Sequence, residues 1–250
     1  MRDKDDNHVL DHPHIFLDEI MRQAADSEII QLSMTVREQR PIQLYKGKDI
    51  QVIRQSDLVS GMYTWADQIL VSTNSTRAAV NQAVRRMLGK GPVPEEGDKV
   101  ICLNNEWDTI DITGSTSLVN GTTGFLKDIK YEDMRFKSLR GQPNFPIMRA
   151  SMQTIDGEIF DDLIIDRKAM LTGDKTLTPA QEYTVHKKGI DPLPVEFNYG
   201  YAITTHKAQG SQWDNVLVFE EGFPYNKIEH ARWLYTAVTR AASKLILVRA

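Results

Sequence analysis

The sequence predicts an α/β protein built on a parallel sheet, with a small β-barrel inserted into it. Residues 68–72 form a short apolar strand pattern, followed by a run with helical spacing that stops at Gly89. Strand and helix patterns alternate again over residues 195–248, which is typical of a parallel sheet. Between them, short β patterns separated by Asn-Gly and Gly turns at residues 97–126 are typical of a small barrel.

The first strand–helix pair carries clear local signals. Either Asn74 or Ser75 can cap the helix, and Gly89, Gly91 and Pro92 end it. The apolar positions that recur at helical spacing are Ala79, Val80, Ala83, Val84, Met87 and Leu88. An amphipathic helix that packs on the preceding strand follows from this pattern.

The predicted insertion consists of short β runs at residues 97–104, 118–126, 149–154 and 162–166. Their spacing suits an antiparallel barrel of five or six strands. The proline pairs Pro92/Pro94 and Pro192/Pro194 mark its expected limits.

The C-terminal part predicts a second series of alternating elements. We expect a strand at 195–197, a helix beginning near Ala202 and a strand at 215–219. A helix at 231–241 and a closing strand at 244–248 complete the series.

Composition limits the class of protein. The 250 residues are 41% hydrophobic and 26% charged, and the apolar run 245–248 is far shorter than the roughly 20 residues that span a bilayer. We therefore expect a soluble, cytoplasmic protein with no membrane partner. A single cysteine, Cys102, excludes an internal disulfide and a zinc ribbon.

The charge is unevenly distributed along the chain. The net charge is −4, yet residues 69–91 contain four basic residues and no acidic one. We expect this stretch to form a local cationic surface for a bound nucleic-acid strand.

Residues 201–212 are the most informative segment. Two hydroxyl residues, Thr204 and Thr205, at the start of a helix would present donors to a phosphate, and Gly210 and Ser211 leave the backbone approachable. An ordinary capped helix whose His206 and Lys207 face solvent explains the same residues without a ligand.

Arg240 ends a small, apolar helix just before the last strand, and Arg22 holds a similar place in residues 17–24. An arginine there can reach across a cleft and stabilise charge that develops in phosphoryl transfer. The alternative is a cation that only complements the helix dipole.

Together these segments resemble, in order, the C-terminal motor half of superfamily 1 DNA helicases of the RecD-like, phage Dda-like branch. Residues 17–24 resemble motif IV, 69–88 the following strand and helix, 201–212 motif V and 233–241 motif VI. Residues 97–126 resemble the SH3-like insertion of that branch. The resemblance implies a RecA-like (P-loop NTPase-type) domain with an inserted SH3-like barrel.

The implied domain organisation has three parts. Residues 1–14 are a linker from a missing N-terminal motor domain, 15–94 and 193–250 form RecA-like domain 2A, and 95–192 form the inserted barrel, domain 2B.

The resemblance also implies residue roles. Arg22 and Arg240 are the expected arginine fingers at the γ-phosphate of ATP. The residues expected to support or contact the nucleotide are Gln23, Gly210, Ser211, Gln212, Tyr235 and Thr239. Those expected to contact single-stranded DNA are Thr73, Asn74, Thr204, Thr205, His206 and Lys207. From its residue type alone, Trp107 in a barrel loop is a candidate for stacking on a base, whereas Trp65 and Trp213 suit the core.

No GxxxxGK[ST] loop occurs in these residues. We therefore expect ATP with Mg²⁺ to bind between this chain and an N-terminal RecA-like domain, with no metal ligand from this chain and no ATPase activity in the isolated chain. His8, His12 and His14 lie in the polar leading segment, which is typical of a linker rather than a metal site. The resemblance implies a monomer that translocates 5′ to 3′.

Two other interpretations remain open. The chain can be a non-catalytic nucleic-acid- or protein-binding module from a truncated helicase gene. It can also be a plain α/β domain in which the arginines are only helix-end cations.

Overall fold

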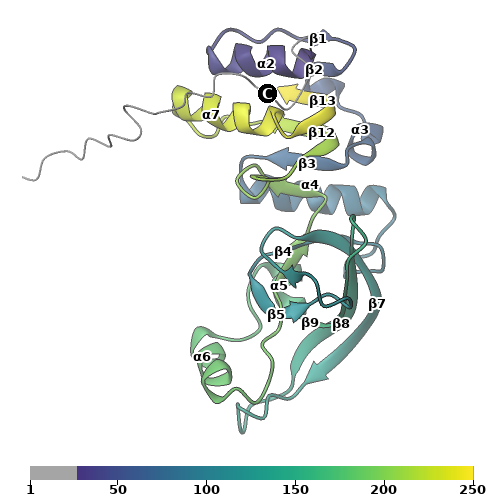
Figure 1. The fold of residues 1–250 in the computed structure, drawn as a ribbon, viewed down its shortest axis with the longest axis vertical. Coiled ribbons are helices and arrows are strands. Elements are labelled where there is room, and N and C mark those ends of the chain that lie inside the picture. The colour runs from purple at the N-terminus through teal and green to yellow at the C-terminus, as the bar shows by residue number, and fades with distance from the viewer. Residues whose placement is uncertain (1–26, 250) are drawn as a thin grey trace, which may run out of the picture.

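The computed structural model describes residues 27–249, which form two units stacked along the long axis (Figure 1). The first unit is a six-stranded sheet covered by helices, and the second is a five-stranded antiparallel sheet with a two-stranded hairpin. Helix α4 (Asn74–Met87) lies between them (Figure 1). The predicted α/β class is confirmed.

The six-stranded sheet has the order β1-β2-β13-β12-β3-β11. Its strands are β1 (Tyr45–Lys46), β2 (Ile50–Arg54), β13 (Ala241–Arg249), β12 (Trp213–Glu220), β3 (Gln68–Val71) and β11 (Ala202–Thr204). All neighbouring strands are parallel except β1 and β2. The carboxyl ends of the parallel strands therefore share one edge of the sheet, as parallel pairing requires.

Helices cover both faces of this sheet. Helices α2 (Glu28–Arg37) and α7 (Lys227–Val238) pack on one face, and α3 (Ser60–Trp65) and α4 pack on the other; a short 3-10 helix, η1 (Gln55–Asp57), precedes α3. The α7-side core includes Leu70, Val216, Val218, Leu245 and Leu247. The α4-side core includes Ile69, Val71, Leu217, Ile246 and Val248. Successive residues of one strand thus enter opposite cores, so both faces of the central strands are apolar.

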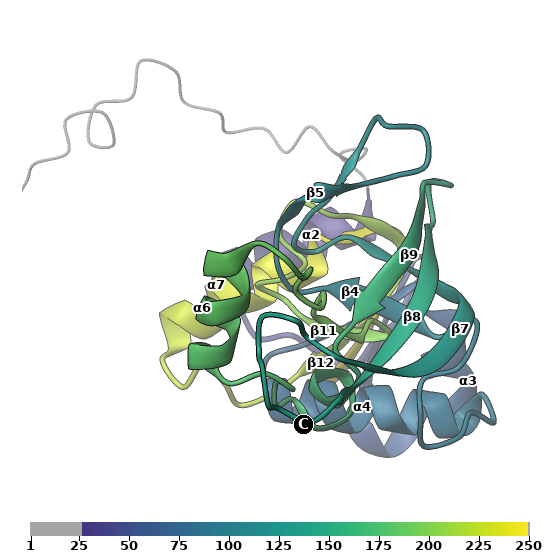
Figure 2. The ribbon, with the colours of Figure 1, turned by 90° about the horizontal axis from the view of Figure 1, so that it is seen from below.

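The second unit contains the antiparallel sheet β10-β4-β7-β8-β9. Its strands are β4 (Lys99–Cys102), β7 (Thr123–Met134), β8 (Phe145–Thr154), β9 (Ile159–Ile165) and β10 (Phe197–Tyr199). The hairpin strands β5 (Glu106–Ile110) and β6 (Ser117–Leu118) and the helices α5 (Arg167–Thr172) and α6 (Pro179–Lys188) complete the unit. Strands β7, β8 and β9 curve strongly (Figure 2).

The two outer strands of this curved sheet, β9 and β10, are joined by backbone hydrogen bonds between β9 and the segment just before β10. Ile165 at the end of β9 forms a bridge with Val195, two residues before β10. The Val195 N–H donates to the Ile164 carbonyl at 2.7 Å, and the Asp166 N–H donates to the Val195 carbonyl at 3.0 Å. The five strands therefore close on themselves.

Strand β4 of the five-stranded sheet contributes side chains to the cores of both units. Ile101 packs in the α7-side core, while its neighbours Val100 and Cys102 pack in the core of the second unit. The two cores are therefore in contact through one strand.

The predicted helix near Ala202 is wrong. Residues 202–204 form β11, which pairs with β3, and residues 205–210 form turns. Ala202 enters the α4-side core and Ile203 the α7-side core. This two-residue period occurs in a strand and not in a helix.

Other boundaries also differ from the prediction. The strand expected at 195–197 in the parallel sheet is β10, which pairs antiparallel with β4, so the second sheet extends past residue 192. Thr73, rather than Asn74 or Ser75, is the N-cap of α4, because its hydroxyl accepts the Thr76 N–H. The helix expected to reach residue 241 ends at Val238, since Ala241 already pairs with Trp213 in the sheet.

The predicted cationic surface at 69–91 is also wrong. Of its basic residues only Arg86 is exposed. Arg85 is buried against the second unit, and Lys90 donates to the Glu96 carbonyl. The helical period places Arg85 on the same side of α4 as the buried Asn81, which bonds the backbone of Ala202 on β11, and Arg85 itself binds Asp98 just before β4.

No helix of residues 27–249 is both long enough and apolar enough to cross a membrane.

Candidate functional site

Residues 205–212 connect the carboxyl end of β11 to the amino end of β12. Because these strands run parallel, the connection must run from one edge of the sheet to the other. Ala208 anchors its middle, since it is fully buried in the α7-side core. The connection therefore links two groups of polar side chains at opposite edges of the sheet.

At the carboxyl edge, Thr205 is held against β3. Its N–H donates to the Val71 carbonyl at 3.0 Å, and its buried hydroxyl lies 3.4 Å from the same oxygen. His206 and Lys207 are exposed, while Thr204 is half-buried. The Lys207 Nζ donates to the Asn120 side-chain oxygen at 2.6 Å, which ties this turn to the second unit.

The amino terminus of α4 lies at the same edge. Glu221, which follows β12, accepts hydrogen bonds from the Ser72 N–H at 2.6 Å and from the Ser72 and Thr76 hydroxyls. Burial opposes ionisation of Glu221, but these hydrogen bonds outweigh it and lower its pKa. The helix end beside Thr73 is thus already occupied by a carboxylate, and Asn74 is exposed beyond it.

At the amino edge, Arg240 meets the end of the connection. Its Nη1 donates to the Ser211 carbonyl at 3.2 Å, and its Nε donates to the Thr236 carbonyl at 3.1 Å. The Nη2 lies 3.4 Å from the Thr239 hydroxyl. Gly210 has a φ of 91°, a left-handed conformation that favours glycine. Motifs that are 29 residues apart in sequence thus meet through Arg240 and Ser211.

The structure divides the predicted site residues between these two edges. Gly210, Ser211, Gln212, Thr239 and Arg240 lie together at the amino edge, and Tyr235 borders a groove between α2 and α7. The residues predicted to contact DNA, which are Thr73, Asn74, Thr204, Thr205, His206 and Lys207, lie at the carboxyl edge. Arg22, Gln23 and the N-terminal histidines lie outside the described residues.

Trp107 lies on β5 rather than in a loop, and 66% of its side chain is exposed. Asn105 beside this strand accepts the Asn120 N–H at 2.9 Å, and Asn120 also binds Lys207. A short chain of hydrogen bonds therefore connects the hairpin that carries Trp107 to the 205–212 connection.

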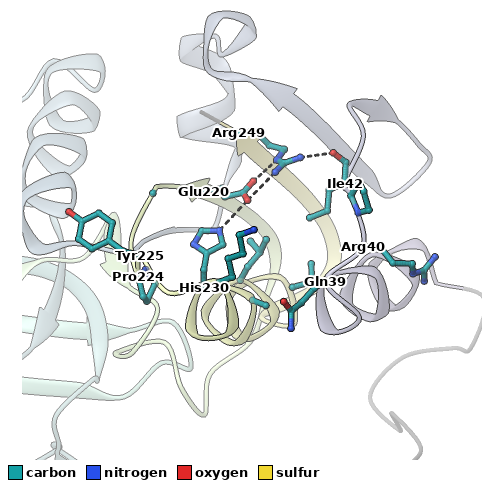
Figure 3. Close-up of a pocket in the computed structure, with 14 residues that line it drawn as sticks. Gln39, Arg40, Ile42, Glu220, Pro224, Tyr225, His230 and Arg249 are labelled. Atoms are coloured by element: carbon teal, nitrogen blue, oxygen red, sulfur yellow. Dashed lines mark hydrogen bonds and ion pairs between the residues drawn. The ribbon is translucent and has the colours of Figure 1, made fainter.

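Sequence reasoning missed a cleft of about 640 Å³ between the segment after α2 and the loop before α7 (Figure 3). The Glu220 Oε1 lies 3.2 Å from the Nη2 of Arg249 and 3.2 Å from the Nε2 of His230. Tyr225 and Arg40 lie at opposite ends of the cleft (Figure 3). The one sequence signal for this region was the Phe-Pro-Tyr-Asn run at 223–226, which is typical of a loop.

The fold and these two edges define an α/β domain with polar loops at both ends of a parallel sheet. The family model for the UvrD-like helicase C-terminal domain matches residues 199–248, which include both the 205–212 connection and Arg240. The predicted resemblance to a superfamily 1 helicase C-terminal domain is therefore confirmed for this segment.

Two sequence relatives share short segments with the chain. An uncharacterized protein of Methanocaldococcus jannaschii is 44% identical over 54 residues, which are 21% of this chain and 4% of that protein. An uncharacterized protein of Acanthamoeba polyphaga mimivirus is 42% identical over 62 residues, 24% of this chain and 12% of that protein.

Solved helicase structures resemble most of the chain at low identity. The Pif1 helicase of Candida albicans is 17% identical with a TM-score of 0.49, over 92% of this chain and 55% of that one. A Bacteroides Pif1 helicase in complex with ADP-AlF3 and single-stranded DNA is 11% identical with a TM-score of 0.49, over 93% and 51%. The chain thus spans about half the length of these helicases.

Proposed function

We propose that this chain is the C-terminal motor domain of an ATP-dependent DNA helicase of superfamily 1, in the RecD-like, Dda-like branch. In this proposal the six-stranded α/β unit is RecA-like domain 2A, and the closed five-stranded unit, which includes β10, is an SH3-like domain 2B. The observation that carries the proposal is the contact of Arg240 with Ser211, because it joins the two helicase-like motifs into one amino-edge group.

The amino-edge group suits a nucleotide phosphate. Arg240 supplies a permanently charged, planar guanidinium. Apart from Gly210 itself and its two chain neighbours, no residue has an atom within 4 Å of the position that a Cβ would take there, so the backbone is open to a ligand. Arg240 and, by analogy of sequence, Arg22 would approach the γ-phosphate, with Gln23, Gln212, Tyr235 and Thr239 in support. Bound ATP with Mg²⁺ would supply the phosphoryl group whose transfer to water releases the free energy, and in the proposal this chain supplies no Mg²⁺ ligand.

The carboxyl-edge group suits the backbone of a single DNA strand. His206 and Lys207 are exposed at the turn after β11, and Thr204, Thr73 and Asn74 lie at the same edge. Thr205 acts in this proposal as a positioning residue, since its hydroxyl and N–H are turned towards Val71. Trp107 would stack on a base beyond the Lys207–Asn120 contact.

The 205–212 connection gives the proposal its mechanism. It is the segment that contacts Arg240 at one edge and carries His206 at the other. Closure of an N-terminal RecA-like domain onto the amino edge would shift Ser211, and Ala208 in the core would transmit that shift to the strand-binding turn. We propose 5′-to-3′ movement by a monomer in an aqueous compartment of the cell.

The test is binding of a fluorescein-labelled oligothymidylate to the purified chain, measured by anisotropy across a salt series. Lys207→Ala should weaken binding and reduce the salt dependence, with a change in slope of about 0.7 for one lost phosphate contact on a single strand. Lys46→Ala is the matched control, because Lys46 is exposed on β1, the outer strand of the sheet that is farthest from β11. Equal effects of the two variants would contradict the assignment of the strand-binding edge.

The nucleotide half has its own test. The purified chain should show no ATP hydrolysis with or without single-stranded DNA, because its sequence contains no GxxxxGK[ST] loop. Turnover of ATP by the chain alone, abolished by Arg240→Ala, would contradict the proposal that a partner domain holds the phosphates.

A further inference from the structure

The loop between β12 and α7 exposes two aromatic rings. Tyr225 is 89% exposed and Phe223 is 40% exposed. Their ring centroids lie 5.7 Å apart at an angle of 88°, an edge-to-face contact. Asn226 caps α7 by accepting the Ile228 N–H at 2.9 Å and the Glu229 N–H at 3.4 Å, which fixes the base of the loop. Two adjacent exposed aromatic rings offer flat apolar surface on which a ligand ring can stack.

This aromatic pair borders a cleft of about 550 Å³ that also includes the strand-binding turn. Thr205, His206 and Gln209 form one wall of the cleft, and the 223–226 loop with the start of α7 forms the other. The rings therefore face the same space as the residues proposed to hold the phosphate backbone.

The inner wall of the cleft is aromatic. Trp233, which is 5% exposed, lines it together with Phe223 and Tyr225. Aromatic side chains are the groups on which the bases of a single strand stack.

The charges around the cleft suit a polyanion. Arg232 borders it, and Lys227 borders the adjoining cleft, which shares Tyr225. Glu229 is the acidic residue of the wall, while Glu220 in the adjoining cleft is already bound to Arg249. Cationic side chains beside exposed aromatic rings are the usual features of a surface that holds a single nucleic-acid strand.

We propose that Tyr225 is a base-stacking residue for the single strand, with Phe223 bracing its ring and Arg232 contacting a phosphate. The inference rests on the proposed function and names a stacking position within it. It places one base on the β12–α7 loop directly beside His206, between two clefts that Tyr225 and Pro224 both line.

The experiment compares Tyr225→Ala with the unsubstituted chain in the oligothymidylate anisotropy assay, with an oligomer of about 12 nucleotides. Loss of one stacked base should weaken binding by about 5- to 150-fold. Tyr225→Trp should retain binding. Tyr183→Ala is the matched control, because Tyr183 is 65% exposed on α6 of the second unit.

Two further measurements separate stacking from charge. Tyr225→Ala should leave the salt slope unchanged, whereas Arg232→Ala should reduce it by about 0.7. An oligomer with abasic sites should bind the unsubstituted chain more weakly, and Tyr225→Ala should cause little further loss with that oligomer.

The outcomes distinguish this inference from the proposed function. If the unsubstituted chain binds and Tyr225→Ala binds equally well, the stacking assignment is overturned while the helicase proposal stands. If the unsubstituted chain does not bind the oligomer at all, both are overturned. Because Tyr225 is almost fully exposed, its substitution should leave the thermal midpoint unchanged, and circular dichroism checks this.

Discussion

Arg85 and Asp98 form a fully enclosed ion pair where α4 meets the second unit. The Arg85 Nε lies 3.0 Å from Oδ1 and the Nη2 lies 3.0 Å from Oδ2, and the two side chains are 1% and 0% exposed. Asp98 also accepts the Tyr201 hydroxyl at 2.9 Å and the Glu95 N–H at 2.7 Å. The guanidinium lies over the Tyr199 ring, 4.3 Å from its centroid.

Removing one partner of this pair should destabilise the protein strongly. Arg85→Ala leaves the buried Asp98 carboxylate with Lys90, whose Nζ lies 3.8 Å from Oδ1, as its remaining cation, and we expect the free energy of unfolding to fall by about 3 kcal/mol. Urea denaturation followed by circular dichroism measures it. Arg86→Ala, at the exposed neighbouring position, should change it by at most about 0.5 kcal/mol. Similar losses in both variants would contradict the enclosed pair.

Lys99 should make stability depend on pH. Burial lowers the pKa of Lys99 to about 8, while Nζ donates to the Gln68 side-chain oxygen at 2.9 Å. Between this pKa and the unfolded value of 10.5 the unfolded chain binds more protons, so stability rises with pH. We expect a gain of about 1 kcal/mol from pH 8 to pH 9. Urea titrations at both pH values measure it.

Lys99→Met is the comparison for that measurement. It should lose the gain between pH 8 and pH 9, because the titrating group is absent. Lys46→Met, on the exposed strand β1, should retain it. If the free energy of unfolding of Lys99→Met rose by the same amount from pH 8 to pH 9, the pH dependence would belong to another titrating group.

Glu221 should stabilise the protein in its ionised form. Glu221→Gln retains the shape but weakens the hydrogen bonds from Ser72 and Thr76, so we expect a loss of about 1–2 kcal/mol at neutral pH. Because the folded pKa is lowered, the contribution is present above the unfolded pKa and is lost as pH falls through the folded pKa. Thermal denaturation from neutral to acidic pH should show the two proteins converging. Glu96→Gln is the control, since Glu96 is exposed.

Gly210 should resist substitution for conformational reasons. Its φ of 91° is unfavourable for a side chain, so Gly210→Ala should cost about 1–3 kcal/mol although the space beside it is open. Gly61→Ala should have the opposite sign, because Gly61 lies inside α3 with no neighbouring atom within 4 Å. Differential scanning calorimetry compares the two. A neutral Gly210→Ala would show that the turn relaxes, and the Arg240–Ser211 contact would then lack its geometric support.

The elements that were predicted correctly from the sequence are those in which a regular apolar pattern is pronounced. Helix α4 and strands β3 and β12 lie where they were expected, because they bury continuous apolar surface. Strand β11 was missed, since three residues are too few to establish a period against the polar run that follows. The sequence predicted no elements between residues 28 and 65. In the structure this segment contains α2, and β2, which pairs with β13.

Site prediction had a different limit. The resemblance assigned Ser211 and Arg240 to one nucleotide site, which stays a prediction; the structure places the two residues in contact beside the adjacent strands β12 and β13. Glu221 was missed because its partner Ser72 is 149 residues away in sequence. Arg85 was misplaced because a charge on an amphipathic helix ordinarily faces water, and its buried partner lies across a unit boundary.

The packing of strand β4 in both cores couples the unfolding of the two units. Ile101 packs in the α7-side core, while Val100 and Cys102 pack in the core of the second unit. Separating the two units would therefore expose buried side chains of β4 to water. Partial unfolding of one unit would expose apolar surface belonging to both. We therefore expect the second unit and the α/β unit to unfold together, in one transition in place of two.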